Sequence, residues 1–311
     1  MSTTTLEEEL TKAAPSRDTY VSVGVFDGVH RGHVYLLDLL KREAARAGCA
    51  TAVVTFRNHP LSILRPDVSI SLLTPVEKRV RLLRDNGIET VVPITFTIEV
   101  SQTPAREFVD LLQRHLRMRG MVVGPDFAMG HNREGTPEVL RAMGREKGFS
   151  VTVAREYLDG DVRISSTAVR NALAQGDLAR VSQYLGRNYA VAGQIVHGAG
   201  RGGPVLGYPT ANVAVESNLG IPGDGIYATW LHVARQRYPA ATSIGVRPTF
   251  GPGERTIEAF VLDFKGDLYH KDVRLEFVKR LRDEVAFDSA EALRKQMDAD
   301  VEETRRVLGL P

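Results

Sequence analysis

The sequence contains very little cysteine. Cys49 is the only one among 311 residues, so the chain cannot form an internal disulfide, and a thiolate metal cluster is excluded. No run of about 18 consecutive apolar residues occurs, which is the length that suggests a membrane helix. The segment Met1–Tyr20 is polar and acidic where a signal peptide needs a basic and then an apolar stretch. These absences predict a cytoplasmic protein with no membrane partner.

The sequence also lacks an excess of charge of either sign. Lys and Arg number 40 and Asp and Glu number 38, which gives a net charge of +2. Such a balance creates no broad positive field for a polyanion, so nucleic acid is not an expected partner. A small anionic substrate needs only a few local positive groups. With 43% hydrophobic and 25% charged residues, the composition is that of a folded globular protein.

The length is about twice that of a typical domain, and the apolar pattern changes along the chain. In the first half, short apolar runs alternate with amphipathic stretches, which predicts βαβ units and a parallel sheet covered by helices on both faces. The expected strands are Val21–Phe26, Thr51–Phe56, Thr90–Ile94, Met121–Val123 and Ser150–Val153, and the expected helices are Gly32–Ala47, Val76–Asn86 and Pro104–Arg117.

After a helical region at Thr167–Leu185, the chain becomes rich in β-type runs punctuated by Gly and Pro. This pattern predicts an antiparallel sheet or a small barrel. Asp288 and Glu291 resemble a capping box, and the apolar stripe that follows predicts a closing helix. We place the domain boundary near Gly186, with domains at 1–186 and 187–311. The expected strands are Ala190–Val196, Ile226–Val233, Thr242–Val246, Thr256–Phe264 and Asp272–Val278, and the stripe is Leu293, Met297 and Val301.

The most informative segment is Gly24–His33, which reads G-V-F-D-G-V-H-R-G-H. Gly28 and Gly32 allow the backbone to approach a ligand, and the free N–H groups of a helix that begins here favour an anion. His30 and His33 lie on one side of a helical turn and can both donate to one phosphate. By residue type alone they could equally be surface or capping histidines, and a zinc site would need at least one more ligand.

The whole segment resembles the G-x-F-D-G-x-H-x-G-H form of the nucleotidylyltransferase signature in FMN adenylyltransferases. Thr74–Lys78, Val122–Phe127 (V-V-G-x-D-F) and Ile164–Arg170 (I-S-S-T-x-x-R) are similar to further segments of that family. The resemblance implies attack of an FMN phosphate oxygen on the α-phosphorus of ATP, with release of pyrophosphate. Positioning and charge neutralisation would carry most of the rate.

The resemblance also assigns roles to single residues. His30 and His33 are implied to stabilise the α-phosphate, and Arg170, together with Mg²⁺, to hold the leaving pyrophosphate. By pattern alone, Arg170 is an exposed helical residue and the hydroxyl residues before it are helix N-caps. The implied ligand-binding residues are Gly24, Phe26, Asp27, Gly28, Gly32, Asp126, Phe127, Ser165, Ser166 and Thr167.

A glycine-rich stretch in the second half contains a formal G-x-G-x-x-G at Gly198, Gly200 and Gly203. Pro204 follows in place of a helix, so we reject a Rossmann dinucleotide site. No G-x-x-x-x-G-K-[ST] occurs either, which excludes a P-loop. A glycine-rich loop between strands can still bind phosphates through its amides.

Gly193–Asn212 as a whole resembles the riboflavin kinase pattern G-x-V-x-H-G-x-x-R-G-x-x-L-G-x-P-T-A-N. The resemblance implies that Thr210 and Asn212 bind the Mg²⁺–ATP phosphates. It also implies that Glu258 is the base that accepts the proton of the riboflavin 5′-hydroxyl. By pattern alone Glu258 is a strand residue facing away from its apolar neighbours, which is common for a solvated glutamate. Further implied binding residues are Gly198, Arg201 and Gly207.

The sequence departs from the family at three positions. Asp267–Lys271 has His270 where the family has glycine, and histidine adopts a positive φ only at some cost, which puts the loop geometry in doubt. Val25 and Met129 also differ from the commoner residues and are interpreted as changes in pocket shape.

The matched motifs are typical of bifunctional riboflavin kinase/FMN adenylyltransferases and cover nearly all of the chain after Tyr20. The resemblance implies an α/β, Rossmann-like nucleotidylyltransferase domain with a doubly wound parallel sheet. A six-stranded riboflavin kinase barrel with a C-terminal helix would follow. ATP, riboflavin, FMN, FAD and Mg²⁺ are the expected ligands of a monomer or weak homo-oligomer. The alternatives are an adenylyltransferase for another phosphorylated acceptor and a flavin-binding regulator with an inactive kinase domain, which the retained Thr210, Asn212 and Glu258 oppose.

Overall fold

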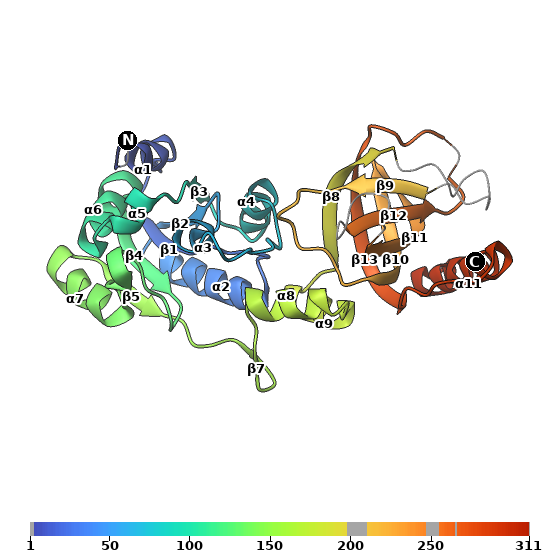
Figure 1. The fold of residues 1–311 in the computed structure, drawn as a ribbon. Coiled ribbons are helices and arrows are strands. Elements are labelled where there is room, and N and C mark those ends of the chain that lie inside the picture. Colours follow the sequence, from blue (N-terminus) through green and yellow to red (C-terminus); the bar gives the residue numbers. More distant parts are fainter. Residues whose placement is uncertain (1–2, 198–209, 247–254, 265, 311) are drawn as a thin grey trace. The chain divides into compact units, whose positions relative to one another are not determined.

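The computed structural model describes residues 3–197, 210–246, 255–264 and 266–310 (Figure 1). The chain divides into two compact units, Met1–Ser166 and Thr167–Pro311. Because this division assigns the helices around 170–185 to the second unit, the functional boundary expected near Gly186 stays a prediction. None of the described helices combines the length and the apolar character needed to cross a membrane.

The first unit is built on a five-stranded parallel sheet with the order β3-β2-β1-β4-β5. The first strand lies in the middle and the chain winds outward in both directions, which confirms the predicted doubly wound sheet. In such sheets ligands bind at the carboxyl ends of the strands, where the winding direction changes. The strands are β1 (Thr19–Val23), β2 (Ala50–Phe56), β3 (Thr90–Ile94), β4 (Met118–Val123) and β5 (Ser150–Val153).

Helices cover both faces of this sheet (Figure 1). Val21 and Val23 of β1 share a core with α1 and α6, whereas Tyr20 points to the other face and shares a core with α2 and α4. Helix α1 lies in the polar N-terminal segment, where the sequence pattern had suggested no element. The helices are α1 (Thr3–Lys12), α2 (Arg31–Arg46), α3 (Pro60–Leu64), α4 (Val76–Asp85), α5 (Ile98–Gln102), α6 (Ala105–Leu116), η1 (His131–Arg133) and α7 (Pro137–Lys147).

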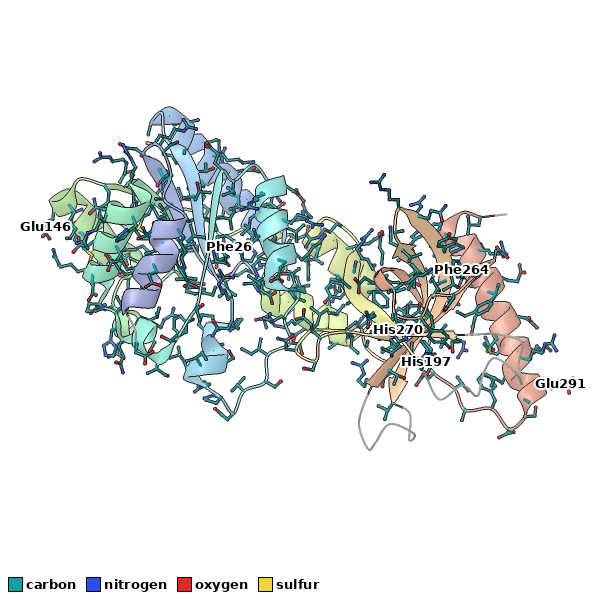
Figure 2. The ribbon with its side chains drawn as sticks, turned by 90° about the horizontal axis from the view of Figure 1, so that it is seen from above. Phe26, Glu146, His197, Phe264, His270 and Glu291 are labelled. Carbon is teal, nitrogen blue, oxygen red and sulfur yellow. The ribbon has the colours of Figure 1, made fainter. Side chains whose placement is uncertain are left out.

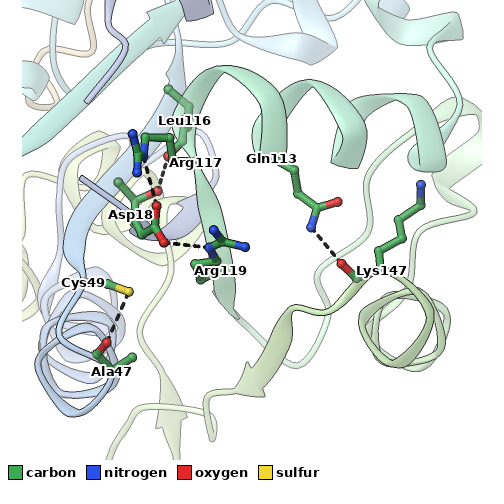
Figure 3. A network of polar contacts seen from close by, with 9 residues as sticks. Asp18, Ala47, Cys49, Gln113, Leu116, Arg117, Arg119 and Lys147 are labelled. Carbon is green, nitrogen blue, oxygen red and sulfur yellow. Dashed lines mark hydrogen bonds and ion pairs between the residues drawn. The ribbon is translucent and has the colours of Figure 1, made fainter. Parts of the chain in front are cut away.

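The amino ends of β1 and β4 are held by a polar cluster (Figure 3). The Asp18 carboxylate accepts hydrogen bonds from Arg117 Nε at 3.0 Å and from Arg119 Nε at 2.7 Å. These two bonds lower the pKa of Asp18. Burial raises the pKa of the nearby Cys49 thiol. The cluster lies at the end of the strands opposite to the ligand-binding edge, so it is structural.

The outer strand β3 contains Pro93, which stands opposite Thr55 of β2. Proline is tolerated in an edge strand because one side of that strand has no hydrogen-bonding partner. After β5, the short strands β6 (Leu158–Asp159) and β7 (Val162–Arg163) form a hairpin.

The second unit is a closed antiparallel barrel with the strand order β10-β11-β12-β9-β8-β13. It confirms the predicted six-stranded barrel, although β9 was expected only from the family resemblance. The elements are α8 (Ser166–Ala174), α9 (Leu178–Leu185), β8 (Tyr189–Val196), β9 (Thr210–Ala214), β10 (Gly225–Val233), β11 (Gln236–Val246), β12 (Arg255–Val261) and β13 (Asp272–Arg282).

Helix α11 (Ala290–Leu308) packs against the barrel, as predicted. The expected capping box is wrong by one residue. Ser289, not Asp288, caps the helix, and its Oγ accepts from the Ala292 N–H at 3.1 Å. The helix is fastened to β13 by a two-bond ion pair in which Arg282 Nε and Nη2 donate to Asp300 at 2.8 and 2.7 Å.

Candidate active sites

The turn that follows β1 has an unusual backbone. Phe26 has φ 52° and Val29 has φ 40°, and Gly28 between them has φ 80°. A positive φ in a bulky or β-branched residue costs about 1–3 kcal/mol and persists only where the surroundings hold it. Both Phe26 and Val29 are buried. The segment that the sequence analysis singled out is therefore a strained loop held in place by its packing.

Asp27 anchors this loop to the segment before α4. Its buried carboxylate accepts hydrogen bonds from Leu73 N at 2.9 Å and from Thr74 N at 3.1 Å. In return, Gly28 N donates to the Thr74 hydroxyl at 3.2 Å. Asp27 therefore has a structural function that the sequence did not reveal, and its ligand-binding role stays a prediction.

The two histidines stack on each other at the start of α2. Their ring centroids are 3.6 Å apart, and His30 Nδ1 accepts from His33 N at 3.2 Å, which caps the helix. The pKa of His33 lies well below its usual value, because burial and then the charges of His30 and Arg79 disfavour protonation. His33 Nδ1 is buried and has no hydrogen-bond partner among the described residues. A neutral imidazole still donates one N–H, so His33 can bind a phosphate oxygen without being charged.

A cavity of about 480 Å³ opens beside the histidines at the carboxyl ends of β1 and β4. Gly28 lies in the adjoining turn, whereas Thr167 and Arg170 lie on α8 in the second unit, so their part in this site stays a prediction. The predicted residues that line the cavity are Gly24, Phe26, Asp27, His30, Gly32, His33, Asp126, Phe127, Ser165 and Ser166.

Close packing beside this cavity explains why a residue without a side chain occupies position Gly32. A Cβ on Gly32 would lie 3.1 Å from His30 Nδ1 and 3.2 Å from the Ile164 carbonyl oxygen. The Ser166 hydroxyl donates to the Asp27 carbonyl at 2.8 Å. The I-S-S segment therefore packs directly against the histidine loop, as two motifs of one site should.

Several residues near this cavity were missed by the sequence analysis, among them two tyrosines and two arginines. Tyr35, Tyr157 and Arg163 line it, and Arg31 donates from Nη2 to the Tyr157 hydroxyl at 2.8 Å. Arg163 also forms an ion pair with Asp126. No sequence signal marks these contacts, because their partners are 126 and 37 residues apart in the chain.

The second site lies on two adjacent strands of the barrel. In the register of β9 and β12, Asn212 stands opposite Glu258 and Thr210 stands opposite Phe260. Thr210 and Asn212 share one face because the buried Ala211 between them points the other way. The Thr210 hydroxyl donates to Glu258 Oε2 at 3.4 Å. The structure thus brings together the three residues that the resemblance singled out, and Glu258 is 7% exposed, not solvated.

A cavity of about 490 Å³ lies beside Glu258 and Thr210, between the barrel wall and α11. Its wall is mostly apolar, which suits a flat ring system with a polar tail. Glu284 lies at its edge, where its carboxylate accepts a hydrogen bond from the Ser243 hydroxyl at 3.0 Å. The apolar lining is Ile226, Ala241, Phe260, Val285, Ala286, Phe287, Leu293, Met297 and Val301, and the remaining polar lining is Ser243, Arg282, Glu284 and Asp300.

His270 adopts the positive φ that a glycine would adopt more easily. It has φ 61°, its N–H donates to Ile195 O at 2.9 Å, and its carbonyl accepts from Gln194 Nε2 at 3.2 Å. Its ring lies 5.6 Å from that of His197 (Figure 2). This loop therefore accommodates a histidine at a positive φ, held by two hydrogen bonds to its backbone. Three predicted binding residues, Gly198, Arg201 and Gly207, lie outside the described residues.

Comparisons with known proteins identify a family for each half of the chain. The FAD synthetase family model matches residues 12–168, and the riboflavin kinase family model matches residues 185–308. The bifunctional riboflavin kinase/FMN adenylyltransferase of Escherichia coli K12 is 36% identical over 299 residues, which are 96% of this chain and 95% of that protein. Its counterpart in Pseudomonas fluorescens is 36% identical over 93% of each chain.

A solved structure from Streptococcus pneumoniae, named as a macrolide-efflux protein, is 30% identical and has a TM-score of 0.87 over 95% of this chain and 96% of its own. The similarity thus extends through both units in sequence and in structure. With two family models covering most of its length and full-length relatives above one-third identity, the chain belongs to the bifunctional riboflavin kinase/FMN adenylyltransferase family.

Proposed function

We propose that this chain phosphorylates riboflavin to FMN and then adenylylates FMN to FAD, using ATP in both steps and releasing pyrophosphate in the second. The observation that carries the proposal is the placement of Glu258 and Thr210 together at an apolar cavity in the barrel. A regulator without kinase activity would have no use for a carboxylate in that position. The histidine pair in the first unit supports the second reaction in the same way.

In the kinase reaction, the flavin ring occupies the apolar cavity beside α11 and its 5′-hydroxyl points to Glu258. The carboxylate accepts the hydroxyl proton as the oxygen attacks the γ-phosphorus of ATP. Thr210 fixes the carboxylate through its hydroxyl, at 3.4 Å. Strand pairing orients both side chains before the substrate binds, which favours the attack.

Mg²⁺ is the metal we propose for the kinase site. Its donors would be the Thr210 hydroxyl and the Asn212 amide oxygen, and oxygen ligands of this kind suit a small hard cation that keeps waters and substrate phosphates as its other ligands. When bound, the metal neutralises charge on the transferring phosphates. No group of three or more His, Cys, Asp or Glu side chains in the described part of the chain is placed to hold a metal alone, so ATP would supply part of the coordination.

In the adenylyl transfer, a phosphate oxygen of FMN attacks the α-phosphorus of ATP, and the bond to pyrophosphate breaks. The attacking oxygen is already ionised, so this site needs no strong base. His30 and His33 donate hydrogen bonds to the α-phosphate, and the amino end of α2 favours the same negative charge. We assign Arg170 to the leaving pyrophosphate on its motif alone.

Four further assignments accompany this function: the domain boundary, the location in the cell, the partners and the oligomeric state. The functional boundary near Gly186 is supported by the end of the first family model at residue 168 and the start of the second at 185. We place the protein in the cytoplasm, with small molecules as its only partners. We expect a monomer or a weak homo-oligomer.

A time course with riboflavin, ATP and Mg²⁺, resolved by chromatography, tests the proposal. FMN should appear first and FAD should follow. If FAD forms only when FMN is supplied, the kinase assignment is wrong. If the protein binds flavin but forms no product from either substrate, it is a flavin-binding regulator.

A further inference from the structure

Arg79 is a buried cation in the first unit, with 1% of its surface exposed. Its guanidinium donates from Nη1 to Phe56 O at 2.7 Å and from Nη2 to Thr74 O at 3.3 Å. Among the described residues these carbonyls are its hydrogen-bond partners, and its Nε has none. Burying a charge that is only partly compensated is costly, so a cation at this position requires a reason.

The hydrogen bonds of Thr74, which Arg79 contacts, supply this reason. Thr74 N donates to the Asp27 carboxylate, its hydroxyl accepts from Gly28 N, and its carbonyl accepts from Arg79. One residue thus joins the buried cation to the buried anion and to the strained turn. Through Phe56, the last residue of β2, Arg79 also ties this junction to the end of the central sheet.

The turn needs such support because of its backbone. Phe26 and Val29 flank Asp27 and Gly28 with positive φ angles, and strain of this kind relaxes where the surrounding contacts are weak. Val29 leads directly into His30, whose ring stacks on His33. A small shift in the turn would therefore move both rings relative to a bound phosphate.

We propose that Arg79 is a positioning residue for adenylyl transfer, acting through Thr74 and Asp27 on the loop that carries His30 and His33. The proposal rests on the proposed function of the first unit. The pKa of His33 supports the nearness of Arg79 to the histidines. Burial lowers this pKa most, and the charges of His30 and Arg79 lower it further.

The test compares Arg79→Met, which keeps length without charge, with Arg79→Lys, which keeps the charge and can contact one carbonyl. Arg79→Met should lower kcat for FMN adenylylation about 10- to 100-fold, with KM for FMN and ATP little changed. The reason is that displaced His30 and His33 rings would stabilise the transition state less well while the substrates still bind. Arg79→Lys should recover part of this loss. Riboflavin phosphorylation by the same molecules serves as the internal control and should be unchanged.

Three results would overturn the proposal. One is a folded Arg79→Met protein with normal kcat, and another is an Arg79→Lys protein no better than Arg79→Met. The third comes from the double variant Asp27→Asn/Arg79→Met. Residues acting through one network are not additive, so the double variant should be no worse than the more impaired single variant. Additive losses would mean that the two residues act separately.

A spectroscopic measurement separates this proposal from the function on which it rests. The ring resonances of His30 and His33 should shift in Arg79→Met or, if that variant does not fold, in Arg79→Lys. This readout holds even if the wild-type chain makes no FAD. Histidine resonances that are unchanged in a folded variant would show that Arg79 does not position the loop.

Discussion

The two sites of this chain are built in opposite ways. The adenylyl-transfer site uses a loop with two strained residues, a helix start and two stacked rings. The loop is anchored by buried hydrogen bonds that the Asp27 carboxylate accepts from Leu73 N and Thr74 N. The kinase site uses side chains on two paired strands, whose direction follows from the pleat alone. The first should therefore be sensitive to changes in the backbone and its anchors, and the second to changes in single side chains.

Glu258→Gln should have the largest effect. It removes the proposed base without altering its size, so riboflavin phosphorylation should fall about 10²- to 10⁴-fold while FAD formation from added FMN is unchanged. Separate assays of the two steps on one preparation measure this. Unaffected FMN formation would remove Glu258 from the mechanism.

His33→Ala should have the next largest effect and the opposite selectivity. The rate of adenylyl transfer should fall about 10²- to 10³-fold, because the variant loses one hydrogen-bond donor to the negative charge that develops in the transition state. The rate of the kinase reaction should be unchanged. The same pair of assays decides the outcome. A near-normal rate of FAD formation would contradict the assignment.

Asp300→Asn tests whether α11 forms a wall of the flavin cavity. It removes the negative charge that pairs with Arg282, in an ion pair whose Arg282 and Asp300 side chains are 22% and 9% exposed. Breaking a buried pair costs about 3–5 kcal/mol, so the loss at this partly exposed pair should lie at or below the lower end of that range. The KM for riboflavin should rise about 10-fold, because the helix packs less firmly. Glu303→Gln, which removes more exposed ion pairs with Arg306 on the same helix and with Lys279 of β13, is the control and should change little.

The histidine pair also predicts a dependence of stability on pH. Because the pKa of His33 is lowered in the folded chain, the unfolded chain binds this proton more readily. Folding stability should therefore fall as the pH drops below about 6.5, the usual histidine pKa. His33→Gln should lose less stability between pH 7 and 5 in thermal unfolding of the first unit. An equal loss in both proteins would mean that His33 titrates normally.

His270→Gly should have the smallest effect. Glycine removes the cost of φ 61° but loses the ring contact with His197, so the unfolding free energy should change by less than about 1 kcal/mol. Chemical denaturation of the barrel measures this change. A large loss of kinase activity would instead give the imidazole a role in catalysis.

Much of the fold could be predicted because its signals are local. The runs at Thr90–Ile94 and Ser150–Val153 are the observed strands β3 and β5 to the residue. Helix α1 was missed although Leu6 and Leu10 have helical spacing and are fully buried, since the polar residues around them hid the pattern. Strand β9 is short and contains an asparagine, so only the resemblance suggested it.

The candidate sites could be predicted as far as their motifs are continuous in sequence. His30, His33 and the I-S-S segment were found in this way. Arg79 was not, because nothing in the sequence indicates that its side chain reaches Phe56, 23 residues away. Asp27 was found, but its contacts with Leu73 and Thr74 depend on a loop 46 residues later in the chain.

The closed barrel and the open sheet also differ in their tendency to aggregate. A barrel whose six strands are all paired presents no strand edge to another molecule, whereas an open sheet ends in two. Pro93 removes an N–H from one of these edges, and β5, with four residues, makes the other short. The proline in β3 therefore protects the first unit from joining its sheet to that of a neighbouring chain during folding.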